Sequence, residues 1–454
     1  MGTACLILVG KKEDREKLMS IYREGAVRIL MVLSLCIGYA LAPGSLLAQE
    51  IQIESPNQVG LSSVRLQRID NLIEEAIEDE VIAGAVALVA RHGRIAFMES
   101  YGMANVTDAK PMRSDTLFRI ASMTKPITSL AIMMLYEEGH FFLTDPVSLF
   151  IPEFKNPLIL SEDSEFSESK GAITIQQLLT HTSGISYKFI SNTDRRARLS
   201  QMYNDAGISD GLSETNNTIA DLSTKLGELP LLFEPGSEFA YGLSIDVLGH
   251  LVEVVSDMSL TDFFENRIFK PLGMTDTHFY LPNSKLERLA TLYSPGEDGR
   301  IHEVTGTIEE GYASFSPTYH HSEPQTYYSG GAGLVSTAPD YLRLLQMFLN
   351  GGELNGMRLL SPKTVQMMTR NNIGPLSVEP GIKFGLGFAI VEEPSMTGGS
   401  KSQGTYYWGG IFNTRFFVDP DEELIGIFMS QLIPRDPRRL RDRFVNTVYQ
   451  AVVQ

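Results

Sequence analysis

The chain of 454 residues contains only two cysteines, Cys5 and Cys36, and both lie within its first 48 residues. The rest of the chain therefore excludes disulfide bonds, thiolate metal sites and a cysteine nucleophile. Basic residues are also scarce, because 38 Lys and Arg stand against 55 Asp and Glu and give a net charge of −17. An acidic chain without a basic run is a poor candidate for binding nucleic acid or an anionic membrane surface.

Signatures of metals and cofactors are missing as well. The eight histidines show no His-Glu-x-x-His or comparable spacing, and His320 and His321 are adjacent, which is more typical of a loop than of one metal site. No phosphate-binding glycine loop or dinucleotide fingerprint occurs. We therefore expect neither a metal nor a cofactor. With 43% hydrophobic and 9% aromatic residues, the composition excludes a largely disordered chain.

Residues 1–48 differ in character from the rest. Two arginines precede an apolar run over 29–42, and a Pro-Gly-Ser break over 43–45 is followed by a candidate cleavage point near Ala48. Fourteen apolar residues are too few to span a bilayer comfortably, so the run favours a secretory signal over an anchor. We expect translation to start at Met19. The remainder should be exported, to the periplasm or beyond, with membrane contact only through an uncleaved leader.

The pattern of apolar residues beyond the leader predicts a helix and a β-hairpin near one end, and a strand pair and a helix near the other. In chain order these elements are expected at 63–77, 85–90, 95–98, 405–418, 424–429 and 440–452. The final helix should bury Leu440, Phe444, Val448 and Val452. The chain shows no repeat, long linker or heptad run.

Sheet-forming segments at both ends, with helices and loops between them, favour an α/β fold of the α+β type. We expect one domain over 49–454. Its sheet part should comprise about 55–140 and 300–454, and its mainly helical insertion about 140–300. The acidic, serine-rich stretch at 161–170 is typical of a solvated loop.

The first candidate for chemistry is the pair Ser122 and Lys125. An apolar helical stripe begins at Ile127, so the two side chains should lie one turn apart at the start of a buried helix. A serine hydroxyl is a weak nucleophile until a base stands beside it, and burial favours the neutral amine of a lysine. The helix N-terminus adds positive potential where negative charge develops during acyl attack. The pair therefore indicates acyl transfer to serine.

Other interpretations of the serines exist. A second Ser-x-x-Lys at 167–170 has no apolar helix behind it, and its acidic neighbours would keep the lysine charged. Gly-Ile-Ser-Asp-Gly at 207–211 matches the nucleophile elbow, which needs an apolar strand before the serine and a helix after it. Polar residues flank Ser209 on both sides, so we interpret that match as accidental. For Ser122 the alternative is an ordinary N-cap next to a surface lysine.

Two more segments attract attention. Tyr241 stands between a Pro-Gly turn and an amphipathic helix, where a tyrosine can present its hydroxyl to a cleft, although packing is the usual role of this residue. Trp408, the only tryptophan, is followed by two glycines, which allow a backbone to approach a ligand closely. Spacing alone does not show that these segments meet Ser122.

Together these motifs resemble those of the serine β-lactamase and penicillin-binding-protein superfamily, and within it the family VIII carboxylesterases and related acyltransferases. The resemblance covers about 55–450. It includes, in the expected order, Leu-Leu-Thr-His-Thr-Ser-Gly at 178–184, Gly-Gly-Ala-Gly-Leu-Val-Ser-Thr at 330–337 and Phe-Gly-Leu-Gly-Phe at 384–388. It implies a β-lactamase/D,D-peptidase-like fold, an antiparallel sheet flanked by helices.

The resemblance also implies a role for each site residue. Ser122 would be the acylated nucleophile, Lys125 its partner base, and Tyr241 the relay that carries the proton to and from Ser122 and the leaving group. The backbone N–H groups of Ser122 and Ile411 would form the oxyanion hole, whose donors are each worth about 2.7–4 kcal/mol of barrier. The strand that binds the substrate would be formed by Trp408, Gly409, Gly410 and Ile411.

Departures from the family pattern bear on the substrate. Tyr-Gly-Leu at 241–243 stands where β-lactamases carry Tyr-x-Asn, and Trp-Gly-Gly at 408–410 stands where they carry Lys-Thr-Gly. An amide and a cation are thereby lost, so the resemblance implies neutral acyl esters and weak β-lactam turnover. Whether water or an alcohol takes the acyl group stays open. His181 is expected to be a structural, hydrogen-bonding residue.

We therefore expect an exported serine hydrolase that cleaves small carboxylic esters through a covalent acyl-enzyme on Ser122. The alternatives within the fold are a β-lactamase, a D-Ala-D-Ala carboxypeptidase and an acyltransferase. An alternative from another class is a binding or sensor module that is acylated once and stays blocked.

Overall fold

The computed structural model describes residues 51–163, 165–434 and 438–454. The expected leader, with its apolar run over 29–42 and the proposed start at Met19, lies outside the described residues. Among the helices of the described part, none is both long enough and apolar enough to cross a membrane.

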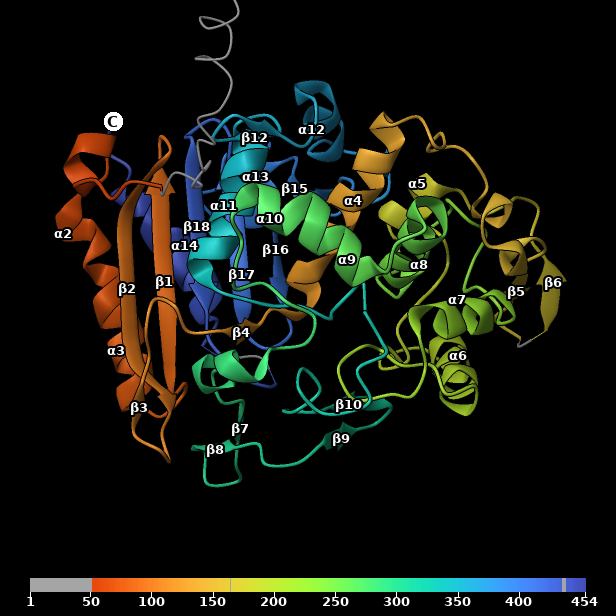
Figure 1. The fold of residues 1–454 in the computed structure, drawn as a ribbon, viewed down its shortest axis with the longest axis horizontal. Helices are drawn as coiled ribbons and strands as arrows, with labels where there is room; N and C mark the ends of the chain where they lie inside the picture. The colour runs from red at the N-terminus through yellow and green to blue at the C-terminus, as the bar shows by residue number, and fades with distance from the viewer. Residues whose placement is uncertain (1–50, 164, 435–437) are drawn as a thin grey trace, which may run out of the picture. The chain divides into compact units, whose positions relative to one another are not determined.

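An antiparallel sheet of eight strands forms the framework, and both ends of the chain contribute to it (Figure 1). β1 and β18, which come from opposite ends of the sequence, pair directly, with Val86 opposite Met429. The order across the sheet is β14 (Ile382–Phe384), β15 (Ala389–Val391), β16 (Tyr406–Gly410), β17 (Thr414–Asp419), β18 (Leu424–Met429), β1 (Gly84–Arg91), β2 (Arg94–Asn105) and β3 (Lys110–Pro111).

The hairpin expected near the N-terminal end is confirmed by the pairing of β1 with β2. The single strand expected over 405–418 is wrong, because the segment forms two strands, β16 and β17, that pair with each other. Asn413 adopts a φ of 70° in the turn between them, a left-handed conformation that asparagine tolerates better than most residues. The turn brings Gly410 opposite Thr414.

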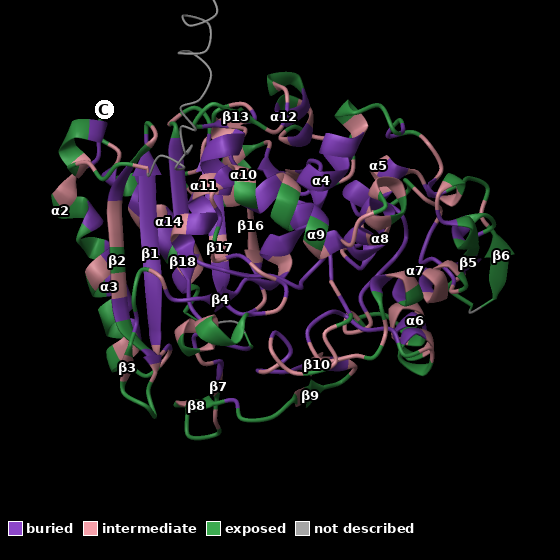
Figure 2. Cartoon of the chain, in the orientation of Figure 1, coloured by how far each residue is buried: buried purple, intermediate pink, exposed green. Residues whose placement is uncertain are grey.

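Helices cover both faces of the sheet, which explains why β1 is buried along its whole length (Figure 2). Because side chains alternate along a strand, Val86 and Leu88 join one hydrophobic core, and Ala87 and Val89 join the other. The first core includes residues of α4 (Lys125–Glu137) and α11 (Ala338–Leu349). The second includes residues of α2 (Ser63–Leu66), α3 (Arg68–Glu78) and α14 (Leu440–Ala451).

The expected terminal helices are therefore present, with small differences. The N-terminal helix is divided between α2 and α3. α14 buries Leu440, Phe444 and Val448, but Val452 lies beyond the end of the helix and is only partly buried.

The middle of the chain is mainly helical, and α8 packs against helices α4, α5, α7 and α9. The helices of this region are α5 (Ile175–Leu179), α6 (Asp194–Asp205), α7 (Ile219–Gly227), α8 (Ser244–Ser256), α9 (Leu260–Phe264), the π-helical η5 (Glu265–Phe269) and α10 (Lys270–Leu272). The acidic stretch is not a plain loop, because β5 (Leu158–Leu160) pairs with β6 (Phe166–Glu168), whose side chains are exposed. The boundaries of the two subdomains stay a prediction.

Short elements complete the described chain. The 3₁₀ helices are η1 (Pro56–Val59), η2 (Ala121–Thr124), η3 (Val147–Leu149), η4 (Pro152–Phe154) and η6 (Asn283–Arg288). The short strand pairs are β4 (Phe118–Arg119) with β11 (Val335–Ser336), β7 (Tyr293–Pro295) with β8 (Ile301–Glu303), β9 (Ile308–Glu310) with β10 (Ala313–Phe315), and β12 (Glu353–Leu354) with β13 (Met357–Arg358). The remaining helices are α12 (Pro362–Met368) and α13 (Pro394–Thr397).

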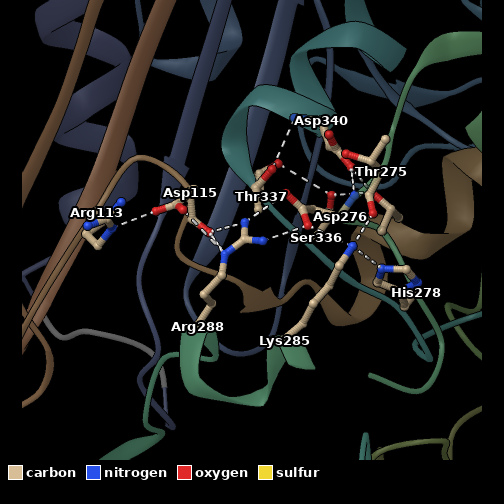
Figure 3. A network of polar contacts seen from close by, with 11 residues as sticks. Arg113, Asp115, Thr275, Asp276, His278, Lys285, Arg288, Ser336, Thr337 and Asp340 are labelled. Atoms are coloured by element: carbon tan, nitrogen blue, oxygen red, sulfur yellow. Dashed lines mark hydrogen bonds and ion pairs between the residues drawn. The ribbon is translucent and has the colours of Figure 1, made fainter. Parts of the chain in front are cut away.

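A polar network fastens the segment after α10 to the start of α11 (Figure 3). Arg288 pairs with Asp276 at 2.7 Å and donates to the carbonyl of Asp115. Asp340 of α11 accepts the N–H of Asp276 at 2.7 Å and the hydroxyl of Thr277 at 2.9 Å. Burial raises the pKa of the Asp340 carboxyl to about 6. The network holds α11, and with it the preceding β11 strand that pairs with β4.

Candidate active site

Ser122 lies in η2, the 3₁₀ turn between β4 and α4, and α4 itself begins at Lys125. The pairing of β4 with β11 and the hydrogen bond from Ile120 N–H to Leu334 O, 3.0 Å long, fix the base of the turn. Ala121 has a φ of 41°, which is uncommon for a residue with a Cβ. Ser122 is partly exposed, although Ala121 and the first residues of α4 are buried. The turn thus presents one hydroxyl from an otherwise buried segment.

Lys125 is completely buried, and its amine contacts three oxygen atoms. Nζ lies 2.7 Å from the hydroxyl of Tyr187, 2.8 Å from the carbonyl oxygen of Gly331 and 3.3 Å from Oγ of Ser122. A buried amine is costly unless its N–H groups find acceptors, and these oxygens provide them. The structure therefore brings the predicted pair together and adds two groups that the sequence analysis did not identify.

Tyr241 lies just before α8, against the same amine. Its ring centroid is 4.7 Å from Nζ of Lys125 and 5.4 Å from the ring of Tyr187. Its hydroxyl accepts a hydrogen bond from the indole N–H of Trp408 at 3.1 Å. Lys125, Tyr241 and Trp408, which come from distant parts of the sequence, are thus in contact through Tyr241. Within the described chain, no hydrogen bond joins the Tyr241 hydroxyl to Ser122, so the proton relay stays a prediction.

The end of β16 lies next to η2. A Cβ at Gly410 would be 2.4 Å from the carbonyl oxygen of Ile120, so the strand can come this close only with glycine at that position. Arg441 of α14 donates to the carbonyl oxygens of Gly410 and Thr414, both at 3.1 Å, and so holds the turn. The N–H of Ile411 forms no hydrogen bond with the described residues. This amide is therefore available to an oxygen atom of a ligand.

Asp246 and Tyr187 are the ionisable groups that the sequence analysis missed. Asp246 of α8 is fully buried and accepts the hydroxyl of Ser329 at 2.6 Å and the N–H of Gly331 at 3.2 Å. Burial raises the pKa of this carboxyl, and the nearby Lys125 amine opposes the rise. Burial, helped by the neighbouring Tyr241 and Asp246, raises the pKa of Tyr187 well above its usual value, so Tyr187 stays a neutral phenol.

The sequence carried weak signals for these groups. Tyr187 follows the Thr-His-Thr-Ser-Gly landmark by three residues, and Gly331 belongs to the Gly-Gly-Ala-Gly landmark. Asp246 is an acidic residue within the buried face of α8. A Cβ at Gly331 would lie 2.3 Å from Oδ2 of Asp246 and 3.4 Å from Nζ of Lys125, so the carboxyl and the amine flank this glycine.

The competing serines lack such surroundings. Ser209 follows helix α6 rather than a strand, and its Oγ accepts the N–H of Gly211 at 3.1 Å, so no nucleophile elbow is formed. The neighbouring Asp210 is buried, and burial raises the pKa of its carboxyl to about 7. In the second Ser-x-x-Lys, Ser167 and Lys170 are both exposed. Neither serine has a buried lysine amine beside it, as Ser122 has.

His181 lies behind Tyr241, with ring centroids 4.7 Å apart. Its Nδ1 accepts the N–H of Gly242 at 3.3 Å, which confirms the expected hydrogen-bonding residue. Burial, assisted by the neighbouring Lys125, lowers the pKa of His181 well below its usual value. A search of residues 51–163, 165–434 and 438–454 finds no cluster of three or more His, Cys, Asp or Glu that could hold a metal ion.

Several known proteins are similar to this chain in sequence or in fold. The family model for Beta-lactamase matches residues 69–450. The chain belongs to the beta-lactamase family. Esterase EstB from Burkholderia gladioli is 34% identical over 362 residues, which cover 78% of this chain and 86% of EstB. Acyltransferase calJ from Penicillium decumbens is 29% identical over 357 residues, 72% of this chain and 78% of calJ.

A solved structure is similar as well. EstCE1, a hydrolase with promiscuous acyltransferase activity, matches with a TM-score of 0.73 and 30% identity, over 86% of this chain and 99% of its own. These similarities confirm the superfamily and the fold class that the motifs indicated. Together with the family membership, they also confirm that the chain is a serine hydrolase.

Proposed function

We propose that this protein hydrolyses carboxylic esters through a covalent acyl-enzyme on Ser122. The observation that carries the proposal is the 3.3 Å contact between Oγ of Ser122 and the buried amine of Lys125. The similarity to EstB and EstCE1 supports ester bonds as the target.

The contacts of Lys125 suit a general base. A neutral lysine has two N–H groups and one lone pair. If the N–H groups donate to the Tyr187 hydroxyl and the Gly331 carbonyl, at 2.7 and 2.8 Å, the lone pair is left for the hydroxyl of Ser122. Lys125 then takes the Ser122 proton while Oγ forms a bond to the carbonyl carbon of the ester.

The other site residues act in the later steps, where they stabilise the negative oxygen and deliver a proton to the leaving group. The negative carbonyl oxygen of the tetrahedral intermediate would accept hydrogen bonds from the N–H groups of Ser122 and Ile411. When the C–O bond to the alcohol breaks, Tyr241 would pass the proton held by Lys125 to the departing oxygen. Water then attacks the acyl-Ser122 ester, which releases the carboxylic acid and restores the serine hydroxyl.

The aromatic side chains around Trp408 favour esters over β-lactams as substrates. Its ring packs against the rings of Tyr241 and Phe384, with centroids 5.1 and 5.4 Å apart. An indole at this position offers no cation to a β-lactam carboxylate. Transfer of the acyl group to an alcohol instead of water is the second candidate, because calJ is named an acyltransferase and EstCE1 a hydrolase with promiscuous acyltransferase activity.

The test combines labelling with turnover. A fluorophosphonate probe should add one adduct, seen by intact mass and mapped to Ser122. Ser122→Ala should abolish both the adduct and the steady hydrolysis of 4-nitrophenyl butyrate, and Ser209→Ala should retain them. A single burst without further turnover would instead identify a blocked binding module. Equal rates with a chromogenic cephalosporin would favour the β-lactamase alternative.

We also propose that the protein is exported, on the basis of the apolar run over 29–42 and the break that follows it. N-terminal sequencing of the protein from the native host should find a new terminus near Ala48 in the exported fraction. A precursor that begins at Met1 would contradict the proposed start at Met19.

A further inference from the structure

A cavity of about 520 Å³ lies between β16, β17 and the start of α14. Basic side chains enter it from three separate segments: the loop before β16, strand β17 and the N-terminal end of α14. In a chain with a net charge of −17, four basic residues around one cavity and two acidic ones form an unusual concentration of positive charge. These residues are Lys401, Arg415, Arg439 and Arg441, with Glu379 and Asp442.

Most of these charges already have partners. Asp442 pairs with Arg415 at 3.3 Å and with Arg439 at 2.9 Å. Arg441 donates to two backbone carbonyls at the end of β16 and the start of β17. The carboxylate of Asp442 is therefore shared between two guanidinium groups, and the cavity keeps an excess of positive charge.

Among these basic residues, Lys401 differs from the three arginines in its contacts. It is only partly exposed, and its ammonium forms no hydrogen bond or ion pair with any residue in the described part of the chain. Nζ lies 5.1 Å from the ring centroid of Tyr407, and the guanidinium carbon of Arg415 lies 4.8 Å from the same ring. The aromatic ring thus holds two cations at one cavity.

Placing two cations, Lys401 and Arg415, next to one ring is unfavourable in free energy unless an anion is present. Burial, followed by the charge of Arg415, lowers the pKa of Lys401 to about 8, although Asp442 and Glu379 act in the opposite direction and Arg439 adds to the lowering. Partly buried like charges are stabilised when an anion lies between them. Ammonium and guanidinium donors are the groups that bind carboxylate and phosphate oxygens in proteins.

We propose that this cavity binds a small oxyanion, a carboxylate or a phosphate group, between Lys401 and Arg415. The anion could be a free metabolite or the charged end of an ester substrate, because Trp408 and Gly409 also line the cavity and lead directly to the Gly410–Ile411 turn. The second source rests on the proposed esterase function. It would modify the expectation of purely neutral esters, because it provides a cation next to β16 for a charged substrate.

The first experiment measures binding of the free anion. Succinate and inorganic phosphate are titrated into the full chain by calorimetry, at pH 7 and constant ionic strength. We expect saturable binding of at least one of them, weakened tenfold or more by Lys401→Gln. The exposed Glu379 lies at the cavity, so Glu379→Gln should strengthen binding. Lys363→Gln, an exposed lysine on α12, is the matched control and should change nothing.

Two results would overturn the proposal. One is the lack of saturable binding of either anion to the wild-type protein. The other is an affinity that neither Lys401→Gln nor Glu379→Gln alters. Because Glu379 is exposed, its variant remains informative even if Lys401→Gln folds poorly.

The second experiment distinguishes the two sources of the anion. The ratio of kcat/KM for 4-nitrophenyl hydrogen succinate to that for 4-nitrophenyl butyrate is measured in each variant. If substrates carry the anion, Lys401→Gln should lower this ratio at least fivefold and Lys363→Gln should not. An unchanged ratio with weakened succinate binding would identify a free anion. No hydrolysis of the butyrate ester would refute the esterase function while leaving the calorimetric result valid.

Discussion

Replacing Tyr187 with phenylalanine should slow ester hydrolysis without unfolding the protein. The Tyr187 hydroxyl lies 2.7 Å from Nζ of Lys125, and both side chains are buried. When Lys125 gains the serine proton, the variant would leave one N–H of the ammonium without an acceptor, and a buried unsatisfied donor costs about 1–3 kcal/mol at that step. Because 1.4 kcal/mol corresponds to about tenfold in rate, kcat/KM should fall about 5- to 150-fold.

The assay is steady-state hydrolysis of 4-nitrophenyl butyrate. The loss should appear mainly in kcat, since Tyr187 acts on the base rather than on substrate binding. Tyr203→Phe is the matched control, because Tyr203 is equally buried but bonds to the backbone of Ser186 instead of Lys125. Urea unfolding of both variants checks the fold. If Tyr187→Phe unfolds like the wild type and keeps kcat/KM within twofold, the assigned role of this hydroxyl is wrong.

Three further predictions concern the surroundings of the site and the stability. Gly331→Ala should lower kcat/KM more than tenfold and reduce the thermal midpoint, because the new Cβ would lie 2.3 Å from Oδ2 of Asp246. Arg441→Ala should lower kcat severalfold with little change in KM, because the guanidinium no longer holds the carbonyl of Gly410. Burial lowers the pKa of His320 well below its usual value, so its contribution to stability is present above about pH 6.5 and lost as the pH falls. Relative to His320→Gln, the wild-type free energy of unfolding should therefore fall by about 1 kcal/mol between about pH 6.5 and 5.5 in urea titrations.

Matched variants test whether these effects are local. Gly306→Ala places a Cβ in open space and should leave activity and midpoint unchanged. Arg443→Ala removes an exposed arginine from the same helix as Arg441 and should keep kcat. Equal losses in the control and the test variant would contradict the assigned contacts. Parallel pH profiles for wild type and His320→Gln would contradict a neutral, buried histidine.

Several features followed from local sequence. Ser122 and Lys125 meet because residues three apart in a helical turn lie on one face, and the apolar stripe after them predicts burial. The β1–β2 hairpin was predictable because two β-rich runs flank a short polar turn. The superfamily was recognised from motifs in the expected order, and the family match confirmed it.

Local sequence failed where turn signals were weak. The turn between β16 and β17 is formed by Ile-Phe-Asn at 411–413, which contains no proline or glycine, so the segment was predicted as one strand. Asn413, with a φ of 70°, provides the left-handed residue of this turn. The error matters because the turn carries Ile411, a proposed oxyanion donor.

The sequence alone indicated the candidate nucleophile, its candidate neighbouring base and the type of chemistry, since these depend on residues close together in the chain. The surroundings of that base were decided only by the tertiary structure. Tyr187 and Gly331 lie 62 and 206 residues from Lys125, and Lys401 and Arg415 come together at their cavity from different segments. Periodicity shows which side chains are buried, but which distant segments share one buried space depends on how the helices and strands pack.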